Sequence, residues 1–322
     1  MVFSNAGGDP RRGAGAAAKR RRGAMSSVAD STPVQARRPA RWRDYGRLTK
    51  SLQTGLLMLT GIAGLASAPG PAAGVELWAG LVLSLLLSIG GSTVLNMVYD
   101  RDIDRIMMRT CARPLPQDRL AVREAAIFGT LLTSAGMLLA FGLDPLYGLL
   151  IAAGVFFNLV VYTLWLKRRT PWSILWGGIA GAMPIVAGRA LGAGMVDAAG
   201  IALGLSVLLW IPTHILTFTL RYEDDYRRAG IPTVSRLHGS GAARRLISAS
   251  SVAAAVAWLA AALALGLGPG VLRLLAVLGL GLIALAMRSA LRPSTRLDLT
   301  LFKYASGFML SGMLVIVIDS VV

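Results

Sequence analysis

Residues 77–110 read LWAGLVLSLLLSIGGSTVLNMVYDRDIDRIMMRT, an apolar run that ends in a cluster of acidic side chains. The apolar part extends from Leu77 to Met97, and about 20 such residues suffice for a helix that crosses a bilayer. Acidic groups at the end of such a helix are costly to keep unless cationic partners occupy them. The segment therefore predicts a membrane protein with a functional site at one surface of the bilayer.

The spacing of the polar residues in this segment indicates that they act together. Asn96, Asp100 and Asp104 are four residues apart, and positions four apart on a helix drift by only about 40°, so the three share one face. Asp102 falls on another face, where we expect it to contact neighbouring arginines or water. Asn and Asp supply the hard oxygen ligands that Mg²⁺ takes when it also binds a substrate phosphate. The alternative is a solvated helix end whose acids pair with nearby arginines.

The composition extends this prediction to the whole chain. Its 322 residues are 55% hydrophobic and only 15% charged, with a mean hydropathy of +0.61, which is typical of a polytopic membrane protein. The apolar segments are rich in small residues, which suits close helix packing in lipid. We predict an all-α fold, a polytopic membrane helical bundle with about nine transmembrane helices around a central cavity. The predicted spans are residues 52–69, 77–97, 121–142, 146–166, 172–192, 198–220, 246–266, 271–287 and 299–319.

The distribution of the basic residues predicts how the bundle is oriented. The net charge is +17, and twelve of the 33 Lys and Arg precede the first span. Of the other 21, all but Arg189 and Arg273 fall in alternate loops, and the positive-inside rule places those loops and the N-terminus in the cytoplasm. The chain has no folded basic face with interleaved aromatic residues, so we expect no nucleic-acid partner. We predict a multi-pass protein of the cell membrane whose active site is cytoplasmic.

Residues 1–43 differ in composition from the rest of the chain, being rich in Ala, Gly, Ser and Arg. We predict a disordered basic tail that is attracted to anionic membrane lipids, followed by a transmembrane domain over residues 44–322. A transit peptide would also be rich in Arg and poor in acids, and it would place the protein in the mitochondrial inner membrane. Met25 is a second possible start. These alternatives stay open.

A second acidic cluster follows the sixth predicted span, where residues 220–234 read LRYEDDYRRAGIPTV. Consecutive residues on a helix fan out by about 100°, so at most two of Glu223, Asp224 and Asp225 face one site. We expect Asp224 and Asp225, with Arg221 one turn earlier as a brace. The alternative is a charged loop that pairs with its own arginines. Two acidic clusters on one membrane face would suit a pair of Mg²⁺ ions that a diphosphate bridges.

A diphosphate also needs cationic side chains, of which Arg suits bidentate contact and Lys acts as a point charge. Each basic residue near the two clusters has the alternative role of a topology signal. The candidates for substrate binding are Lys50, Arg109, Arg113, Lys167 and Arg168.

His214 lies in the apolar run WIPTHILTF, two residues after Pro212. A proline inside a membrane helix loosens the helix and frees backbone carbonyls. A lone His in a span is more often hydrogen-bonded to a neighbour, but an ionisable side chain within a membrane is a functional candidate by default. We therefore add His214 to the candidate substrate-binding residues.

The first cluster also resembles a known motif. NMVYDRDIDRIMMRTCARPLP, residues 96–116, is similar to the first aspartate-rich motif of the UbiA superfamily of intramembrane prenyltransferases. Asn96, Asp100 and Asp104 match its Asn-x-x-x-Asp-x-x-x-Asp frame. The resemblance extends over about residues 48–320 and leaves the N-terminal tail unmatched.

Within the superfamily, the chain most resembles the protohaem IX farnesyltransferases (haem O synthases). KRRTPWSILWGGIAGAMP at 167–184 and DYRRAGIP at 225–232 carry this likeness. The chain departs from the branch at PTHIL, residues 212–216, where the branch has Pro-Pro-His-Phe-Trp, and at KSL, residues 50–52, where the branch has Lys-Pro-Arg. It departs from the wider superfamily at Arg221, where the second motif has Asp.

The resemblance implies a Mg²⁺-dependent transfer of a polyprenyl group, of farnesyl or geranyl type, from its diphosphate to protohaem IX, with His214 orienting the porphyrin. An alternative acceptor is 4-hydroxybenzoate or another aromatic ring, and a distant alternative function is cation-coupled transport. The expected Mg²⁺ ligands are Asn96, Asp100, Asp104, Asp224 and Asp225, of which Asp100, Asp104 and Asp225 are the expected catalytic residues.

Overall fold

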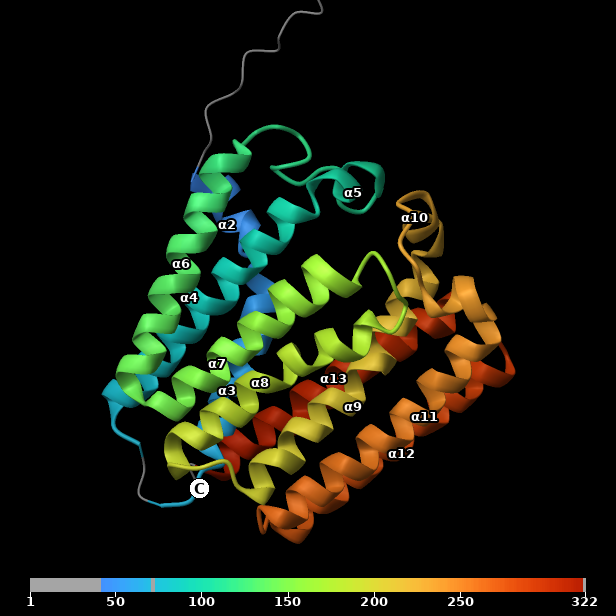
Figure 1. Ribbon diagram of the computed structural model, residues 1–322. Helices are drawn as coiled ribbons and strands as arrows, with labels where there is room; N and C mark the ends of the chain where they lie inside the picture. The colour runs from blue at the N-terminus through green and yellow to red at the C-terminus, as the bar shows by residue number, and fades with distance from the viewer. Residues whose placement is uncertain (1–41, 71–72, 321–322) are drawn as a thin grey trace, which may run out of the picture. The chain divides into compact units, whose positions relative to one another are not determined.

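The computed structural model describes residues 42–70 and 73–320, and every regular element in this part of the chain is a helix. This confirms the predicted all-α class. In chain order (Figure 1), the helices are α2 (Trp42–Leu48), α3 (Ser51–Ala66), α4 (Val75–Tyr99), α5 (Arg101–Ile106), α6 (Val122–Leu143), α7 (Pro145–Phe156), the π-helix η1 (Phe157–Leu166), α8 (Ser173–Ala193), α9 (Ala198–Arg221), α10 (Glu223–Arg228), α11 (Val234–Ala264), α12 (Pro269–Leu291) and α13 (Thr295–Asp319).

The lengths and composition of these helices fit a bilayer. Among the described residues, 8 helical segments are long and apolar enough to cross a membrane, with η1 continuing α7 as one of them. The helix α3 is a further apolar helix of 16 residues, shorter than the others. The bundle of about nine transmembrane helices is therefore confirmed, and the chain is a multi-pass membrane protein.

Polar side chains mark where several of these helices begin. The Asp144 carboxylate accepts a hydrogen bond from the backbone N–H of Tyr147 at the start of α7 (2.7 Å), and Pro145 follows it at the first helical position. Asp197 accepts from the N–H of Gly200 in the same way at the start of α9 (2.8 Å). Such caps satisfy backbone donors that have no partner within the helix.

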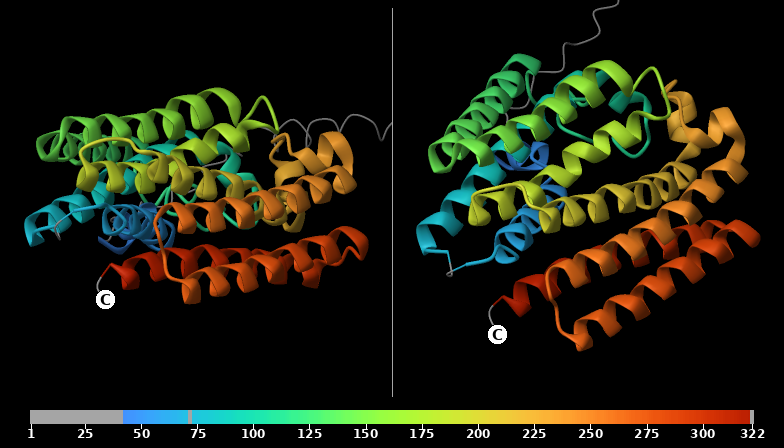
Figure 2. Two further views of the ribbon diagram at one scale, coloured as in Figure 1. Left: turned by 90° about the horizontal axis from the view of Figure 1, so that it is seen from below. Right: turned by 60° about the horizontal axis from the view of Figure 1, so that its bottom comes forward.

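Small residues allow the helices to approach closely, as the composition of the spans predicts. Where α3 crosses α8, a Cβ on Gly188 would lie 2.0 Å from the carbonyl oxygen of Gly61, and a Cβ on Gly64 would lie 2.1 Å from that of Ile185. No other residue fits at this crossing. The helix α3 also contacts α4 and α13. In turn, α13 contacts α12, and α12 contacts α11; Figure 2 shows α11, α12 and α13 grouped together, coloured orange to red.

The two short helices α5 and α10 stand at one end of the bundle (Figure 1). The first of them follows α4 directly, and the second follows α9, so both acidic clusters lie at this end. The π-helix η1 ends there too, at Leu166. The predicted tail, residues 1–43, lies outside the described residues apart from Trp42 and Arg43, which begin α2.

Candidate active site

A polar cavity of about 170 Å³ lies at the end of the bundle that carries α5 and α10. Side chains from α3, α4, α5, η1 and α10 and from the loops between them meet around it. The lining residues are Lys50, Gln53, Thr93, Asn96, Asp100, Ile103, Asp104, Met107, Arg109, Arg113, Asn158, Tyr162, Lys167, Tyr226 and Ile231.

The first acidic cluster forms one wall of this cavity. Asn96, Asp100 and Asp104 all line it, although the α-helix α4 ends at Tyr99 and Asp100 itself has the non-helical angles φ −85° and ψ 4°. The helical hydrogen bonds continue across this break, because the N–H of Asp100 donates to the Asn96 carbonyl (2.9 Å) and that of Asp104 to the Asp100 carbonyl (2.8 Å). Residues four apart therefore still face the same cavity, although α4 and α5 are separate helices.

Basic side chains from distant parts of the chain neutralise this wall. Arg113 donates to Asp104 Oδ2 at 2.7 Å, and the Lys167 ammonium donates to Asp100 Oδ2. Burial opposes the charge on Lys167, but Tyr162 and Asp100 raise its pKa above the ordinary value. Both cations line the cavity, as expected for substrate-binding residues.

Asp100 has the most buried carboxylate of the cluster. The residue is only 2% exposed, and its Oδ1 atom is buried with no hydrogen-bond partner. The nearest guanidinium nitrogen, on Arg168, lies 3.9 Å away, beyond hydrogen-bond distance. An unsatisfied buried carboxylate oxygen is expensive, so this atom is available to a cation that the cavity binds.

Asn96 is oriented by a neighbouring helix. Its Nδ2 donates to Thr163 Oγ1 on η1 at 2.7 Å, and Thr163 donates to the Asn158 carbonyl at 2.7 Å. The amide oxygen of Asn96 is therefore the atom that remains for a ligand.

The π-helical winding of η1 also brings Asn158 and Tyr162 to the cavity. Neither residue was a candidate from the sequence, since nothing in an apolar run marks a π-helix.

Arg168 and Asp102 pair with each other outside the cavity. The guanidinium of Arg168 binds both carboxylate oxygens of Asp102 at 2.7 Å and lies over the ring of Tyr99. Asp102 thus points away from the cavity, as predicted, but toward Arg168 rather than toward its nearest arginines. Those two, Arg101 and Arg105, bind Asp118 instead.

Lys50 contributes a further basic side chain to the cavity. It adopts a left-handed backbone conformation (φ 46°) just before α3, which is costly for a residue with a side chain. Burial, together with the nearby charges of Arg113 and Lys167, lowers its pKa to about 7. No hydrogen bond or ion pair of its ammonium is found within the described residues.

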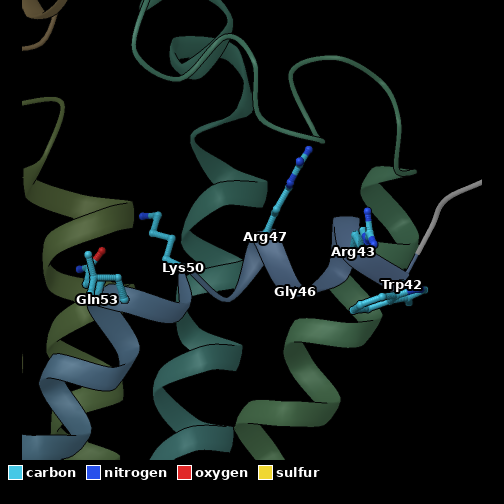
Figure 3. A pocket seen from close by; sticks show the side chains of 7 residues that line it. Trp42, Arg43, Gly46, Arg47, Lys50 and Gln53 are labelled. Atoms are coloured by element: carbon cyan, nitrogen blue, oxygen red, sulfur yellow. The ribbon is translucent and has the colours of Figure 1, made fainter.

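Lys50 and Gln53 also border a second, open depression of about 640 Å³ beside α2. Figure 3 shows its lining, in which the Lys50 side chain extends away from that of Arg47. The two hollows thus share these two residues. Lys50 therefore lies at the boundary between the polar cavity and the open depression.

The two acids of the second cluster that we expected to act together are separated. Asp224 is exposed, with 76% of its side chain accessible, and pairs with Arg227, so it lies outside the cavity. Asp225 is only 5% exposed and accepts hydrogen bonds from three donors. The predicted brace, Arg221, lies over the ring of Tyr222 instead. On the short helix α10, adjacent residues point in different directions, which explains why the pair does not converge.

Arg109 reaches the cavity from the segment that follows α5. Its guanidinium lies over the ring of Phe218 at 4.8 Å and over that of Tyr222 at 5.8 Å. Cation–π contacts of this kind hold a guanidinium in place without neutralising it. The charge of Arg109 is therefore available to an anion in the cavity.

His214 lies elsewhere, on α9, where its side chain faces α13. Its ring stacks between those of Trp210 and Phe302, with centroids 4.6 and 4.5 Å away, and its Nδ1 atom is 3.2 Å from the hydroxyl of Ser306. It does not line the polar cavity.

The residues of the wall fit a magnesium ion that also binds a phosphate. Within the described part of the chain, no three His, Cys, Asp or Glu side chains converge as a complete metal cage. Two carboxylates, one of which is Asp100 with its free Oδ1, and one amide leave coordination positions for phosphate oxygens and water, which is how Mg²⁺ is commonly held.

The chain is similar to known proteins over most of its length. The chain matches the model of the UbiA prenyltransferase family over residues 57–311. It is 37% identical over 265 residues to a protein of Pyrobaculum neutrophilum named protoheme IX farnesyltransferase, covering 81% of this chain and 94% of that protein. A protein of the same name from Korarchaeum cryptofilum is 39% identical over 261 residues, which cover 80% and 87% of the two chains.

A solved structure has the same fold. The structure of a UbiA homolog from Archaeoglobus fulgidus bound to DMAPP and Mg²⁺ superimposes with a TM-score of 0.65 over 85% of this chain and 99% of that one, at 19% sequence identity.

Proposed function

The chain belongs to the UbiA prenyltransferase family, and we propose that its polar cavity binds the diphosphate of a polyprenyl donor together with Mg²⁺. The observation that carries this proposal is the unpartnered, buried Oδ1 of Asp100 in a cavity that cationic side chains surround. In the proposed site, Asn96, Asp100 and Asp104 hold the metal. Lys50, Arg109, Arg113 and Lys167 bind the diphosphate.

The proposed chemistry is the cleavage of the allylic C–O bond between the prenyl group and the diphosphate. Negative charge develops on the departing diphosphate, and preorganised cations stabilise that charge in a site with little water. When bound, Mg²⁺ acts as a Lewis acid on the same oxygens. Arg109 and, when protonated, Lys50 form no ion pair with a carboxylate of the described residues, so their charges are available to the diphosphate.

We propose farnesyl diphosphate as the donor and protohaem IX as the acceptor, because relatives that align over most of the chain carry the name protoheme IX farnesyltransferase. The C1 atom of the farnesyl group would bond to a vinyl carbon of the porphyrin, and water would complete a hydroxyethylfarnesyl side chain and release a proton. His214, which lies between two aromatic rings and away from the diphosphate cavity, is the residue that we propose for the acceptor. The cytoplasmic orientation of the site and the attraction of the basic tail to membrane lipids are part of the proposal.

The test is product analysis. Membranes from cells that express the chain are given labelled farnesyl diphosphate with protohaem or with 4-hydroxybenzoate, and the lipid extract is analysed for haem O and for prenylated benzoate. We expect haem O and a Mg²⁺-dependent release of pyrophosphate. Prenylated benzoate alone would replace the proposed acceptor, and the absence of pyrophosphate release would favour a transporter.

Lys50 predicts a pH dependence of donor binding. Because its pKa is about 7, Lys50 is protonated at pH 6 and largely neutral at pH 9. The carboxylates of Asp100 and Asp104 raise this pKa, but they offset the lowering only in part. An anionic diphosphate binds the protonated form, so the KM for the donor should rise with pH, by up to about tenfold per unit above the pKa.

The matched variant for this prediction is Lys50→Arg, because a guanidinium stays charged over the whole range. Its KM should change little between pH 6 and 9. Equal slopes for the wild type and the variant would contradict a role of Lys50 in the pH dependence.

A further inference from the structure

The hydrogen bonds of Asp225 describe a different role from that of a metal ligand. Its Oδ1 accepts from the backbone N–H of Met108 at 3.1 Å and from the Arg228 guanidinium at 2.6 Å. Its Oδ2 accepts from the backbone N–H of Arg109 at 3.2 Å. Both oxygens are thus engaged, whereas one oxygen of Asp100 has no partner.

These contacts join two segments that are far apart in the sequence. Asp225 belongs to α10, and Met108 and Arg109 follow α5, where the backbone turns away from helical geometry at Met107. The neighbouring Tyr226 lines the cavity, but Asp225 is not among the lining residues. The carboxylate is therefore directed to the backbone of the other segment.

The residue that this contact positions is Arg109. Its N–H is bound to Asp225, and its side chain lies against Phe218 and Tyr222 and lines the cavity. Its backbone is thus attached to α10 and its guanidinium to the end of α9. With both attachments in place, the charge stands at the cavity before a ligand arrives, which lowers the cost of binding an anion.

We infer that Asp225 is a positioning residue, which holds Arg109 at the cavity through the backbone of Met108 and Arg109, and that it is not a ligand of Mg²⁺. The inference rests on the proposed function, because it assigns the second acidic cluster a role in the same diphosphate site. It replaces the expectation that both clusters supply metal ligands. The metal is then held from the α4–α5 side alone, and cationic side chains complete the diphosphate site.

The sharpest test compares Asp225→Asn with Asp100→Asn in purified full-length protein. Two quantities are measured. The first is the KM for farnesyl diphosphate. The second is the affinity for Mn²⁺, which is measured by electron paramagnetic resonance at a saturating concentration of a thiolodiphosphate analogue of the donor. Asp225→Asn keeps only part of the hydrogen bonding, so its KM should rise about tenfold, while its Mn²⁺ affinity stays within about twofold of the wild type. Asp100→Asn should weaken Mn²⁺ binding at least about tenfold.

The control is Glu223→Gln, which removes a negative charge from the same helix at a residue outside the cavity. Its KM and Mn²⁺ affinity should equal those of the wild type. Thermal unfolding of each variant distinguishes a displaced Arg109 from a destabilised fold. A merely structural role of Asp225 would lower the unfolding temperature without a selective rise in KM.

Asp225→Glu tests whether the position of the carboxylate, rather than its charge, is what matters. This variant can also be used if Asp225→Asn does not fold. The longer side chain keeps the charge and the ability to bind a metal, but it displaces the two backbone contacts. We expect the raised KM to persist in Asp225→Glu. Recovery of the wild-type KM by Glu would overturn the inference.

Two further outcomes would also overturn it. The first is a loss of Mn²⁺ affinity in Asp225→Asn as large as that in Asp100→Asn, which would make Asp225 a ligand. The second is an unchanged KM in Asp225→Asn, which would leave Arg109 independent of it. Failure of the proposed function looks different, because the wild type itself would then neither bind the Mn²⁺–analogue complex nor release pyrophosphate.

Discussion

Asp100→Asn is expected to lower kcat/KM for the polyprenyl donor by on the order of 100- to 1,000-fold, the range found when one preorganised group at a developing charge is lost. Asp100 is buried, and its Oδ1 is the oxygen that no protein donor satisfies. Asn preserves the shape of the side chain but offers a neutral oxygen and an N–H₂ group to the metal. The measurement is steady-state release of pyrophosphate at saturating Mg²⁺.

Asp118→Asn is a suitable comparison for this variant. Asp118 is half exposed and binds Arg101 and Arg105 at the surface, and its left-handed backbone (φ 53°) is one that Asn tolerates as well as Asp. Because surface ion pairs contribute little, its activity should stay within about twofold of the wild type. Wild-type turnover in Asp100→Asn would refute the proposed metal site.

The fold could be predicted from the sequence because the bilayer constrains it so strongly. The spans predicted at 198–220 and 172–192 correspond to α9 (Ala198–Arg221) and α8 (Ser173–Ala193). The largest difference is at α11, which begins at Val234 although its predicted span begins at 246. Hydropathy marks only the apolar part of a helix. The first turns of α11 carry polar and basic residues, and a kink at Gly239 (φ 82°, ψ 155°) separates them from the apolar part.

The candidate site could be predicted only in part. The spacing of Asn96, Asp100 and Asp104 was sufficient to place them on one wall, since that geometry is local. The partners of these acids could not be predicted, because Lys167 meets Asp100 from 67 residues away through helix packing. For the same reason the sequence could identify the second cluster but not the orientation of its members, which a contact between Asp225 and the backbone of Met108 decides.

The contact between Lys167 and Asp100 predicts a second large effect, on stability as well as activity. In Lys167→Met, the Asp100 carboxylate loses its ammonium partner while it remains 2% exposed. Breaking a buried ion pair by removing one member typically costs about 3–5 kcal/mol, because an uncompensated charge remains. We expect a marked fall in the thermal unfolding temperature of the detergent-purified protein, together with loss of transfer.

The double variant Asp100→Asn/Lys167→Met separates the two effects. Removing both charges eliminates the uncompensated carboxylate, so most of the lost stability should return, as a strong non-additivity between the two substitutions. Transfer activity should not return, because the metal ligand and the diphosphate-binding cation are both absent. If stability stayed as low as in Lys167→Met, the ion pair would not explain the cost; if activity returned with stability, the two residues would serve the fold rather than the reaction. Lys167 and Asp100 thus neutralise each other in the protein, and the same two charges are the ones that a metal and a diphosphate require.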